Sequence, residues 1–377
     1  MANKDNLRND IKALLPEIKL ANVEMEAKRR LPYALAKKMA KAGVFRLITP
    51  NSLGGFELSL PEISAHIANV SDVNASAAWC TIIACTNTLA AAYLPRSEAK
   101  EIFGKPDVIT GGIFAPSGTA IEDGDTYVLS GHWQWGSGSA NTSWMGCGAH
   151  IEGRDVPPRM LFFPTSDCEL VDSWHVAGLK GTGSGDIIVK ELRVPKSRSV
   201  ALGFDKPVET GPLYTFPPFC LLAIGVASVA YGNAAGALES FKALALSKKS
   251  SGASRTLSER ETIRVEYAKA QARLRSAYAY MQDEMERSWD IALREGSHSL
   301  EDRSDLRLAC TYMTRNCADV TRILYERAGG SALFLTSDLQ RRFRDAYAMT
   351  QHIITAPATY DLTGRILLGL PTQGHMV

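Results

Sequence analysis

Residues 131–138 read GHWQWGSG and lie in the middle of a β-rich segment that interrupts an otherwise helical chain. Trp133 and Trp135 stand two residues apart, and glycines enclose Ser137. Side chains two residues apart on a strand point to the same face, so the two tryptophans fit a half-buried strand that turns both rings into a core. By its residues alone the stretch therefore predicts a strand, and it leaves open whether Trp135 and Ser137 have a further role.

The strand signals extend from about residue 108 to residue 200. Short runs such as VITGGIF and RMLFFP alternate with glycine and proline turns, and residues 122–125 (EDGD) form a strong turn signal. On both sides of this segment the apolar residues recur at helical spacing. We therefore expect an N-terminal α-helical domain at 1–104, a central β domain at 105–210 and a C-terminal four-helix-bundle domain at 211–377.

Four long helical segments are expected in the C-terminal region, at about residues 221–245, 259–294, 299–329 and 340–370. Ser299 is the expected N-cap of the third segment, and Pro357 must kink or break the last. Three glycines on one face of the first segment permit close approach of a neighbouring backbone; they are Gly225, Gly232 and Gly236. Long helices with short connections predict an antiparallel bundle.

The composition excludes several classes of protein. The formal net charge is only +2, so a nucleic-acid-binding protein is not expected. The seven cysteines form no CxxC pair, which argues against a disulfide scaffold or a metal site and fits a reducing cytoplasm. The N-terminal residues lack the apolar core of a secretory signal. The most apolar stretch, 221–238, is diluted by small and polar residues and is expected to be a buried helix rather than a membrane span.

A second motif, GLKGTGSGD, occupies residues 178–186. Its four glycines permit left-handed backbone and close approach to a ligand. A phosphate loop is not indicated, because GxxxxGK[ST] is absent and no helix follows directly. A tight connection before a strand accounts for most of the glycines, and Thr182 and Ser184 carry the hydroxyls that could bind a ligand.

The third motif consists of AGGSAL at 328–333, LQRRFRD at 339–345 and a Gln-His pair at 351–352. On one continuous helix Asp345, Met349 and His352 would stand at i, i+4 and i+7 and share a face. A single histidine on a helix is usually structural, so the spacing alone does not make His352 functional.

Together the three motifs resemble the acyl-CoA dehydrogenase superfamily, and more closely its branch of two-component flavin monooxygenases. This branch includes aromatic hydroxylases, sulfur-oxidising desulfurisation enzymes and indole oxygenases. The resemblance covers nearly the whole chain and implies an α+β fold of N-terminal helices, a central β-barrel or sandwich and a C-terminal four-helix bundle. It implies that Trp135 packs on the isoalloxazine ring, that Ser137 bonds flavin N5 and that His352 acts as an acid or base over the flavin. The other cofactor-binding residues that it implies are Phe114, Thr182, Ser184, Gly329, Gly330 and Asp345.

The sequence departs from the superfamily in two ways that narrow the function. Dehydrogenation needs a carboxylate base, yet residues 357–364 (PATYDLTG) contain no glutamate, and residues 114–120 (FAPSGTA) lack the usual glutamate and aspartate. Phenol hydroxylases of the branch often carry a substrate-side histidine near residues 85–87 or 139–141, and this chain has none there. This favours a substrate that is electron-rich without ionisation, such as an indole or indole acid.

The expected protein is therefore the oxygenase component of a two-component monooxygenase. A separate NAD(P)H-dependent reductase supplies reduced FAD or FMN, O₂ adds at flavin C4a to give a hydroperoxide, and one oxygen atom is transferred to a small aromatic substrate. A homotetramer is expected, without a metal, a nucleic acid or a membrane as partner. The alternatives are an acyl-CoA dehydrogenase or oxidase, a phenol hydroxylase and a non-catalytic helical scaffold.

Overall fold

The structure is a computed structural model that describes residues 4–249 and 254–372. The chain forms two compact units, which we call the sheet unit and the bundle unit. The sheet unit comprises the described parts of Met1–Ser59, Trp79–Val176 and Lys180–Pro218, and the bundle unit comprises Leu60–Ala78, Ala177–Leu179 and the described parts of Phe219–Val377. This division assigns two short segments to the bundle unit that the expected three domains place elsewhere, and the boundaries of those three domains stay predictions.

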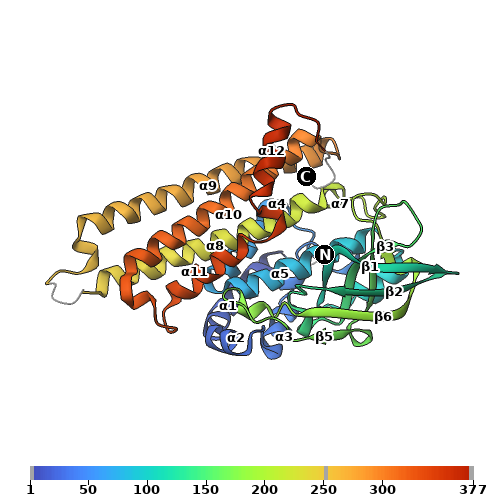
Figure 1. The fold of residues 1–377 in the computed structure, drawn as a ribbon, viewed down its shortest axis with the longest axis horizontal. Coiled ribbons are helices and arrows are strands. Elements are labelled where there is room, and N and C mark those ends of the chain that lie inside the picture. Colours follow the sequence, from blue (N-terminus) through green and yellow to red (C-terminus); the bar gives the residue numbers. More distant parts are fainter. Residues whose placement is uncertain (1–3, 250–253, 373–377) are drawn as a thin grey trace. The chain divides into compact units, whose positions relative to one another are not determined.

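A mixed seven-stranded sheet is the main element of the sheet unit (Figure 1). The strand order is β5-β6-β2-β1-β3-β4-β7. Among these neighbours β1 and β3 run parallel, and every other pair runs antiparallel. The strands are β1 (Thr110–Asp123), β2 (Thr126–Trp133), β3 (Trp144–Ile151), β4 (Arg159–Pro164), β5 (Glu169–Val171), β6 (Asp186–Pro195) and β7 (Ser199–Val200). Gly124, with a φ of 56°, forms the predicted turn between β1 and β2.

The two faces of the sheet pack against separate apolar clusters. Phe162 and Phe163 are neighbours on β4 and point to opposite faces, as the strand period requires. Phe163 joins the cluster that contains Trp133, and Phe162 joins a second cluster. The second cluster includes buried residues of the 3₁₀ helix η3 (Thr88–Ala92) and of α6 (Arg96–Phe103), so these two elements cover that face.

The remaining helices of the sheet unit are short to medium in length. On α1 the buried residues Leu7, Ile11 and Ile18 lie on one side, which confirms the helical spacing predicted for this region. These helices are α1 (Lys4–Leu20), α2 (Asn22–Lys28), α3 (Tyr33–Lys41), α7 (Pro212–Thr215) and the part of α5 (Ala75–Asn87) that begins at Trp79.

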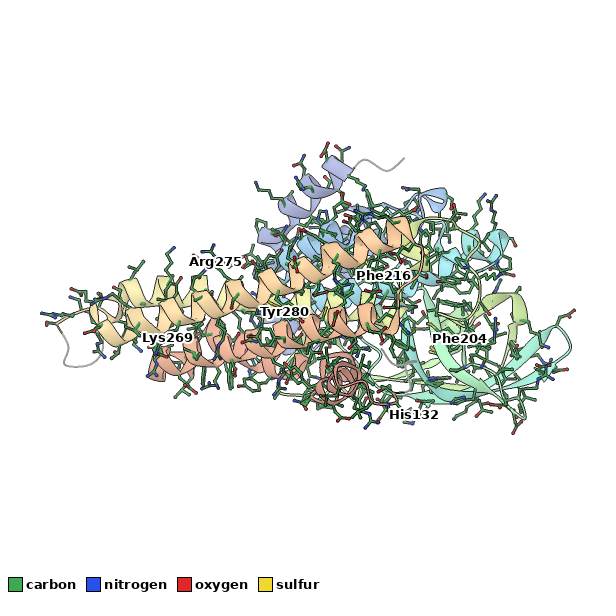
Figure 2. All side chains as sticks on the ribbon, turned by 90° about the horizontal axis from the view of Figure 1, so that it is seen from above. His132, Phe204, Phe216, Lys269, Arg275 and Tyr280 are labelled. Atoms are coloured by element: carbon green, nitrogen blue, oxygen red, sulfur yellow. The ribbon has the colours of Figure 1, made fainter. Side chains whose placement is uncertain are left out.

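The bundle unit contains the long helices predicted for the C-terminal region. They are α8 (Pro218–Ser247), α9 (Glu261–Arg294), α10 (Leu300–Ala328), α11 (Asp338–Met349) and α12 (Ala358–Leu367). The unit also contains α4 (Leu60–Val73), from the region predicted as the N-terminal domain. Helices α9, α10 and α11 lie side by side (Figure 1). Figure 2 shows Lys269, Arg275 and Tyr280 along α9, where the two basic side chains are exposed.

Local signals explain where these helices begin and end. The Ser299 hydroxyl accepts the Asp302 N–H, and the Asp302 carboxylate accepts the Ser299 N–H, so a complete capping box confirms the predicted N-cap of α10. Gly296 and Gly329 follow the ends of α9 and α10 with φ values of 69° and 59°. These are backbone conformations that glycine adopts with little strain.

Helix α8 is almost entirely buried, as its composition predicted. By length and hydropathy two segments, α8 and Ala75–Ala92, could cross a membrane, but 89% and 94% of their apolar windows are buried inside the structure, as in the core helices of soluble proteins. A Cβ on Gly232 would stand 2.2 Å from the Ala68 carbonyl oxygen of α4, which confirms the predicted close approach of backbones. At Gly236 the space is instead filled by the Arg342 guanidinium.

Candidate functional site

The two glycine-rich motifs of the sheet unit lie side by side. The Gly136 N–H donates to the Gly185 carbonyl at 2.9 Å, and the Gly138 N–H donates to the Thr182 carbonyl at 2.8 Å. The second motif makes one 3₁₀ turn, Lys180–Thr182, and leads into β6, as expected. These two backbone hydrogen bonds place Ser137 beside the hydroxyls of the second motif.

Ser137 is the centre of a buried hydrogen-bond network. Its Oγ lies 2.7 Å from Ser184 Oγ, which in turn lies 2.7 Å from Thr182 Oγ1. The indole N–H of Trp79 donates to Ser137 Oγ at 3.1 Å. All four residues are buried. The structure therefore brings together three of the predicted site residues, and it adds Trp79, which the sequence analysis missed.

The two tryptophans of the first motif have opposite environments. Strand β2 ends at Trp133, whose ring is fully buried and whose indole N–H donates to the Gly148 carbonyl at 2.8 Å. Trp135 lies beyond the strand with a φ of 70°, and 68% of it is exposed. The prediction of one strand with both rings on a core face is wrong, because the left-handed residue turns Trp135 outward. Left-handed conformations of large residues are strained and are often found at functional sites.

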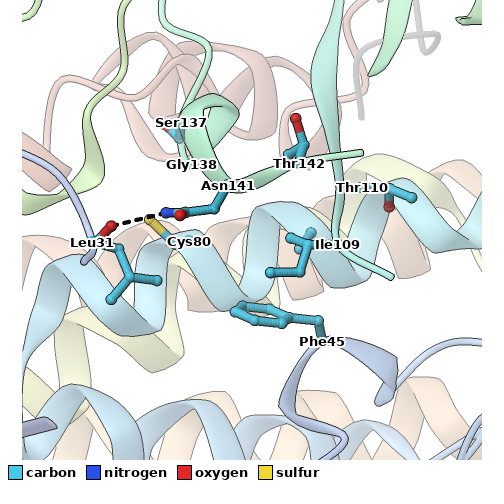
Figure 3. A pocket seen from close by; sticks show the side chains of 10 residues that line it. Leu31, Phe45, Cys80, Ile109, Thr110, Ser137, Gly138, Asn141 and Thr142 are labelled. Atoms are coloured by element: carbon cyan, nitrogen blue, oxygen red, sulfur yellow. Dashed lines mark hydrogen bonds between the residues drawn. The ribbon is translucent and has the colours of Figure 1, made fainter. Parts of the chain in front are cut away.

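A small pocket adjoins Ser137 in the sheet unit (Figure 3). Thr110 lines it, and its buried hydroxyl has no hydrogen-bond partner in the structure. Asn141 also lines it and donates its side-chain N–H to the Leu31 carbonyl at 2.9 Å. Burial raises the pKa of Cys80 in the pocket wall to about 12, so this thiol stays protonated at neutral pH and is no nucleophile.

Asp345, a predicted cofactor residue, has a structural contact inside the bundle unit. It is buried, and its carboxylate accepts the Leu179 N–H at 2.6 Å. Next to this contact, a Cβ on Gly178 would stand 2.1 Å from the Arg344 carbonyl oxygen, so glycine is required there. Asp345 thus holds the segment 177–179 against α11. A role in cofactor binding stays a prediction.

The arginines of the third motif are bound to protein groups. Arg341 and Arg342 both pair with Asp338, and Arg342 also donates to the Asp72 carbonyl at 2.6 Å. Burial would raise the pKa of Asp338, but the guanidinium groups of Arg342 and Arg341 outweigh it and hold this pKa well below its usual range. This cluster anchors α11 within the bundle unit.

His352 does not lie on a helix face with Asp345 and Met349, so that prediction is wrong. Helix α11 ends at Met349, and His352 is the N-cap of the 3₁₀ helix η10 (Ile353–Thr355). Its Nδ1 accepts the Ile354 N–H at 3.3 Å. Three β-branched residues in η10 and then Pro357 disfavour a continuous helix through this segment.

The surroundings of His352 keep its imidazole neutral. Burial and, to a smaller extent, the positive charge of Arg307 together lower the pKa of His352 to about 4. Arg307 itself donates to the Ile354 carbonyl at 2.9 Å. A neutral imidazole cannot serve as an acid at pH 7, so these contacts favour a capping role, and the catalytic role of His352 stays a prediction.

The other predicted cofactor residues are two exposed glycines and a half-buried phenylalanine. Gly329 and Gly330 are exposed at the end of α10, and a Cβ on Gly330 would meet open space. Phe114 of β1 is half-buried and packs against the second apolar cluster of the sheet. Their binding roles stay predictions.

Comparisons with known proteins agree with this fold. The family model "Acyl-CoA dehydrogenase, C-terminal domain" matches residues 224–357. The chain is 30% identical over 378 residues to indole-3-acetate monooxygenase of Acinetobacter baumannii, with 97% of this chain and 96% of the relative covered. It is 29% identical over 358 residues to indole-3-acetate monooxygenase of Pseudomonas putida, with 94% and 91% covered. Among solved structures, the HsaA monooxygenase from M. tuberculosis matches with a TM-score of 0.89 at 25% identity, over 99% of both chains.

The order of helices, mixed sheet and helical bundle is that of the acyl-CoA dehydrogenase fold. The chain belongs to the acyl-CoA dehydrogenase superfamily, in its branch of two-component flavin-dependent monooxygenases. It is an oxidoreductase that uses reduced flavin and O₂. The resemblance carried by the three sequence motifs is thereby confirmed.

Proposed function

We propose that this oxygenase component acts on an indole or an indole acid, with reduced FAD or FMN supplied by a separate reductase. The observation that carries the flavin part of the proposal is Ser137, which has one hydrogen-bonding position left beside the exposed Trp135. Two relatives at 30% and 29% identity are named for indole-3-acetate, which supports the substrate class. The lack of a histidine at 85–87 and 139–141 supports it further, because a phenol would need a base.

The residues of the sheet unit fit a flavin in distinct ways. The exposed ring of Trp135 offers an apolar surface on which a flat ring can stack. Ser137 offers a single hydrogen bond from a buried, oriented hydroxyl, and Ser184 and Thr182 hold that hydroxyl in place. When bound, reduced flavin supplies the activation of O₂. The protein's part is to bind, to orient and to exclude water.

Dehydrogenation of an acyl-CoA fits the structure less well. It needs a carboxylate in an enclosed site to remove a proton from carbon. The acid nearest to the expected position is Asp361, and it is exposed on α12. A water-exposed carboxylate with this placement is a poor base for such a proton.

The substrate proposal is tested with the purified chain, a generic flavin reductase, NADH and ¹⁸O₂. The panel contains indole, indole-3-acetate, a simple phenol and an acyl-CoA, each with reduced FAD and with reduced FMN. We expect one ¹⁸O atom in the indole products and little turnover of the phenol. Efficient hydroxylation of the phenol with inert indoles would overturn the substrate class and leave the monooxygenase assignment intact.

We also propose that the chain assembles as a homotetramer in the cytoplasm. The apolar side chains of Leu333, Phe334 and Leu335 are 69%, 68% and 85% exposed in the connection between α10 and α11, which suits burial against further copies of the chain. The seven cysteines are free thiols, which fits a reducing compartment. Light scattering should give four times 41 kDa for the wild type and a smaller species for Leu335→Asp.

The matched control for assembly is Leu20→Asp, because Leu20 is 83% exposed on α1 in the sheet unit. This variant should remain a tetramer. A wild-type monomer at micromolar concentration would contradict the assembly proposal.

A further inference from the structure

Every hydrogen-bonding position of the Ser137 hydroxyl can be assigned. A hydroxyl has one hydrogen to donate and two lone pairs to accept. An indole N–H can only donate, so Trp79 takes one lone pair of Ser137 Oγ. Ser184 takes a second position, as donor or as acceptor. One position therefore remains on Ser137, and its character depends on the direction of the bond to Ser184.

The direction of that bond is coupled to Thr182. If Ser137 donates to Ser184, the Ser184 hydrogen is directed to Thr182, and the position left on Ser137 is an acceptor. If Thr182 donates to Ser184, the Ser184 hydrogen goes to Ser137, and the position left on Ser137 is a donor. Both arrangements use the same oxygen positions, 2.7 Å apart in each pair. The three hydroxyls thus switch together.

We propose that this hydroxyl chain reverses with the redox state of the bound flavin, and that Thr182 is the positioning residue that favours the reduced form. The inference rests on the proposed function, because it takes flavin N5 as the partner of Ser137. N5 carries a hydrogen in reduced flavin and none in oxidised flavin. Ser137 must therefore accept from the reduced form and donate to the oxidised form, with no net transfer of a proton.

Thr182 supports the arrangement in which Ser137 accepts, because it supplies the acceptor for the Ser184 hydrogen, which would otherwise be a buried donor without a partner there. Because Ser184 and Thr182 are buried, the Ser184 hydrogen cannot bond to solvent water instead. With valine at 182 the only remaining acceptor for Ser184 among its two contacts is Ser137. Ser137 then presents its hydrogen, which suits the oxidised flavin. Trp79 enforces the switch, since it leaves Ser137 a single position.

The experiment measures dissociation constants for oxidised and for anaerobically reduced FMN and FAD by equilibrium dialysis. The ratio of the oxidised to the reduced constant is compared in the wild type, Thr182→Val, Thr182→Ser, Ser137→Ala and the double variant Ser137→Ala/Thr182→Val. Loss of the bond bias should lower the ratio by about threefold to tenfold in Thr182→Val. Thr182→Ser keeps a hydroxyl and should resemble the wild type.

The double variant separates the hydroxyl chain from a general effect on folding. In the Ser137→Ala background the Thr182→Val change should leave the ratio unaltered, because no hydroxyl remains to reorient. An unchanged ratio in Thr182→Val, or an equal fall with and without Ser137, would overturn the inference. If Thr182→Val does not fold, Ser184→Ala interrupts the same chain and must lower the ratio. A wild type that binds neither flavin form would overturn the proposed flavin site as well.

Discussion

Replacing His352 with asparagine removes a titrating group and keeps a side chain that can cap η10. In the wild type the imidazole Nδ1 accepts the Ile354 N–H, and the Asn Oδ1 can accept the same hydrogen. Burial, aided by the charge of Arg307, lowers the pKa of His352 to about 4 in the folded protein. The variant therefore isolates the effect of that pKa on the free energy of unfolding.

The sign and size of the effect follow from linkage. The unfolded chain takes up the proton near pH 6.5 and the folded chain only near pH 4, so the free energy of unfolding falls as the pH falls between these values. A pKa difference of about 2.5 corresponds to about 3 kcal/mol in total. Of this, about 2 kcal/mol should be lost between pH 7.5 and pH 5.

The assay is equilibrium unfolding in urea at several pH values from 7.5 to 5. Other groups also titrate in this range, so the quantity compared is the difference in slope between the wild type and His352→Asn. We expect the variant to lose about 2 kcal/mol less than the wild type over this range. His150→Asn is the matched control, because His150 is exposed on β3, and it should keep the wild-type slope.

Equal pH slopes for the wild type and His352→Asn would refute this reasoning. The same variant tests the predicted catalytic role. If His352 transfers a proton in the reaction, turnover should fall by a factor of about 10²–10⁴. If it only caps η10, turnover per folded molecule should stay near the wild-type value.

Three further substitutions test the site. Trp133→Ala should lower the free energy of unfolding, measured in urea, by about 3–5 kcal/mol, because its ring fills the sheet core. Trp135→Ala should change the free energy of unfolding by less than about 0.5 kcal/mol and should weaken the binding of reduced flavin in dialysis. The reverse pattern would exchange the roles of the two tryptophans. Ser137→Ala should raise the H₂O₂ released per substrate oxidised by about threefold to tenfold, with Ser137→Thr near the wild type, and unchanged coupling would remove Ser137 from the site. Asp345→Ala should lower the free energy of unfolding by about 3 kcal/mol, because it removes the carboxylate that accepts the Leu179 N–H and lies near the Arg341 guanidinium, and Asp345→Asn should lower it less. Equal, small losses in both variants would contradict the proposed role of Asp345 in holding the segment 177–179 against α11.

Much of the fold could be predicted because its signals are local. The Ser299 cap, the glycine after α10 and the Asp123–Gly124 turn depend on residues within about four positions of each other. Apolar spacing likewise predicted the long helices of the bundle unit. The motifs at 131–138 and 178–186 could be assigned to one site only through the resemblance to a family, because neither stretch contains a local signal that the two are in contact.

Long-range packing determined the details of the site. Whether Trp133 or Trp135 enters the core depends on where β2 ends, and that end is set by pairing with β6, not by the alternation of the two rings. Trp79 and Ser137 are 58 positions apart, and only the fold brings the indole N–H to the hydroxyl. The position of His352 has a local cause instead, because the three β-branched residues and Pro357 that follow it disfavour a continuous helix. Helical and strand periods report which residues can share a face, whereas hydrogen-bond partners across the chain depend on tertiary contacts that no local pattern encodes.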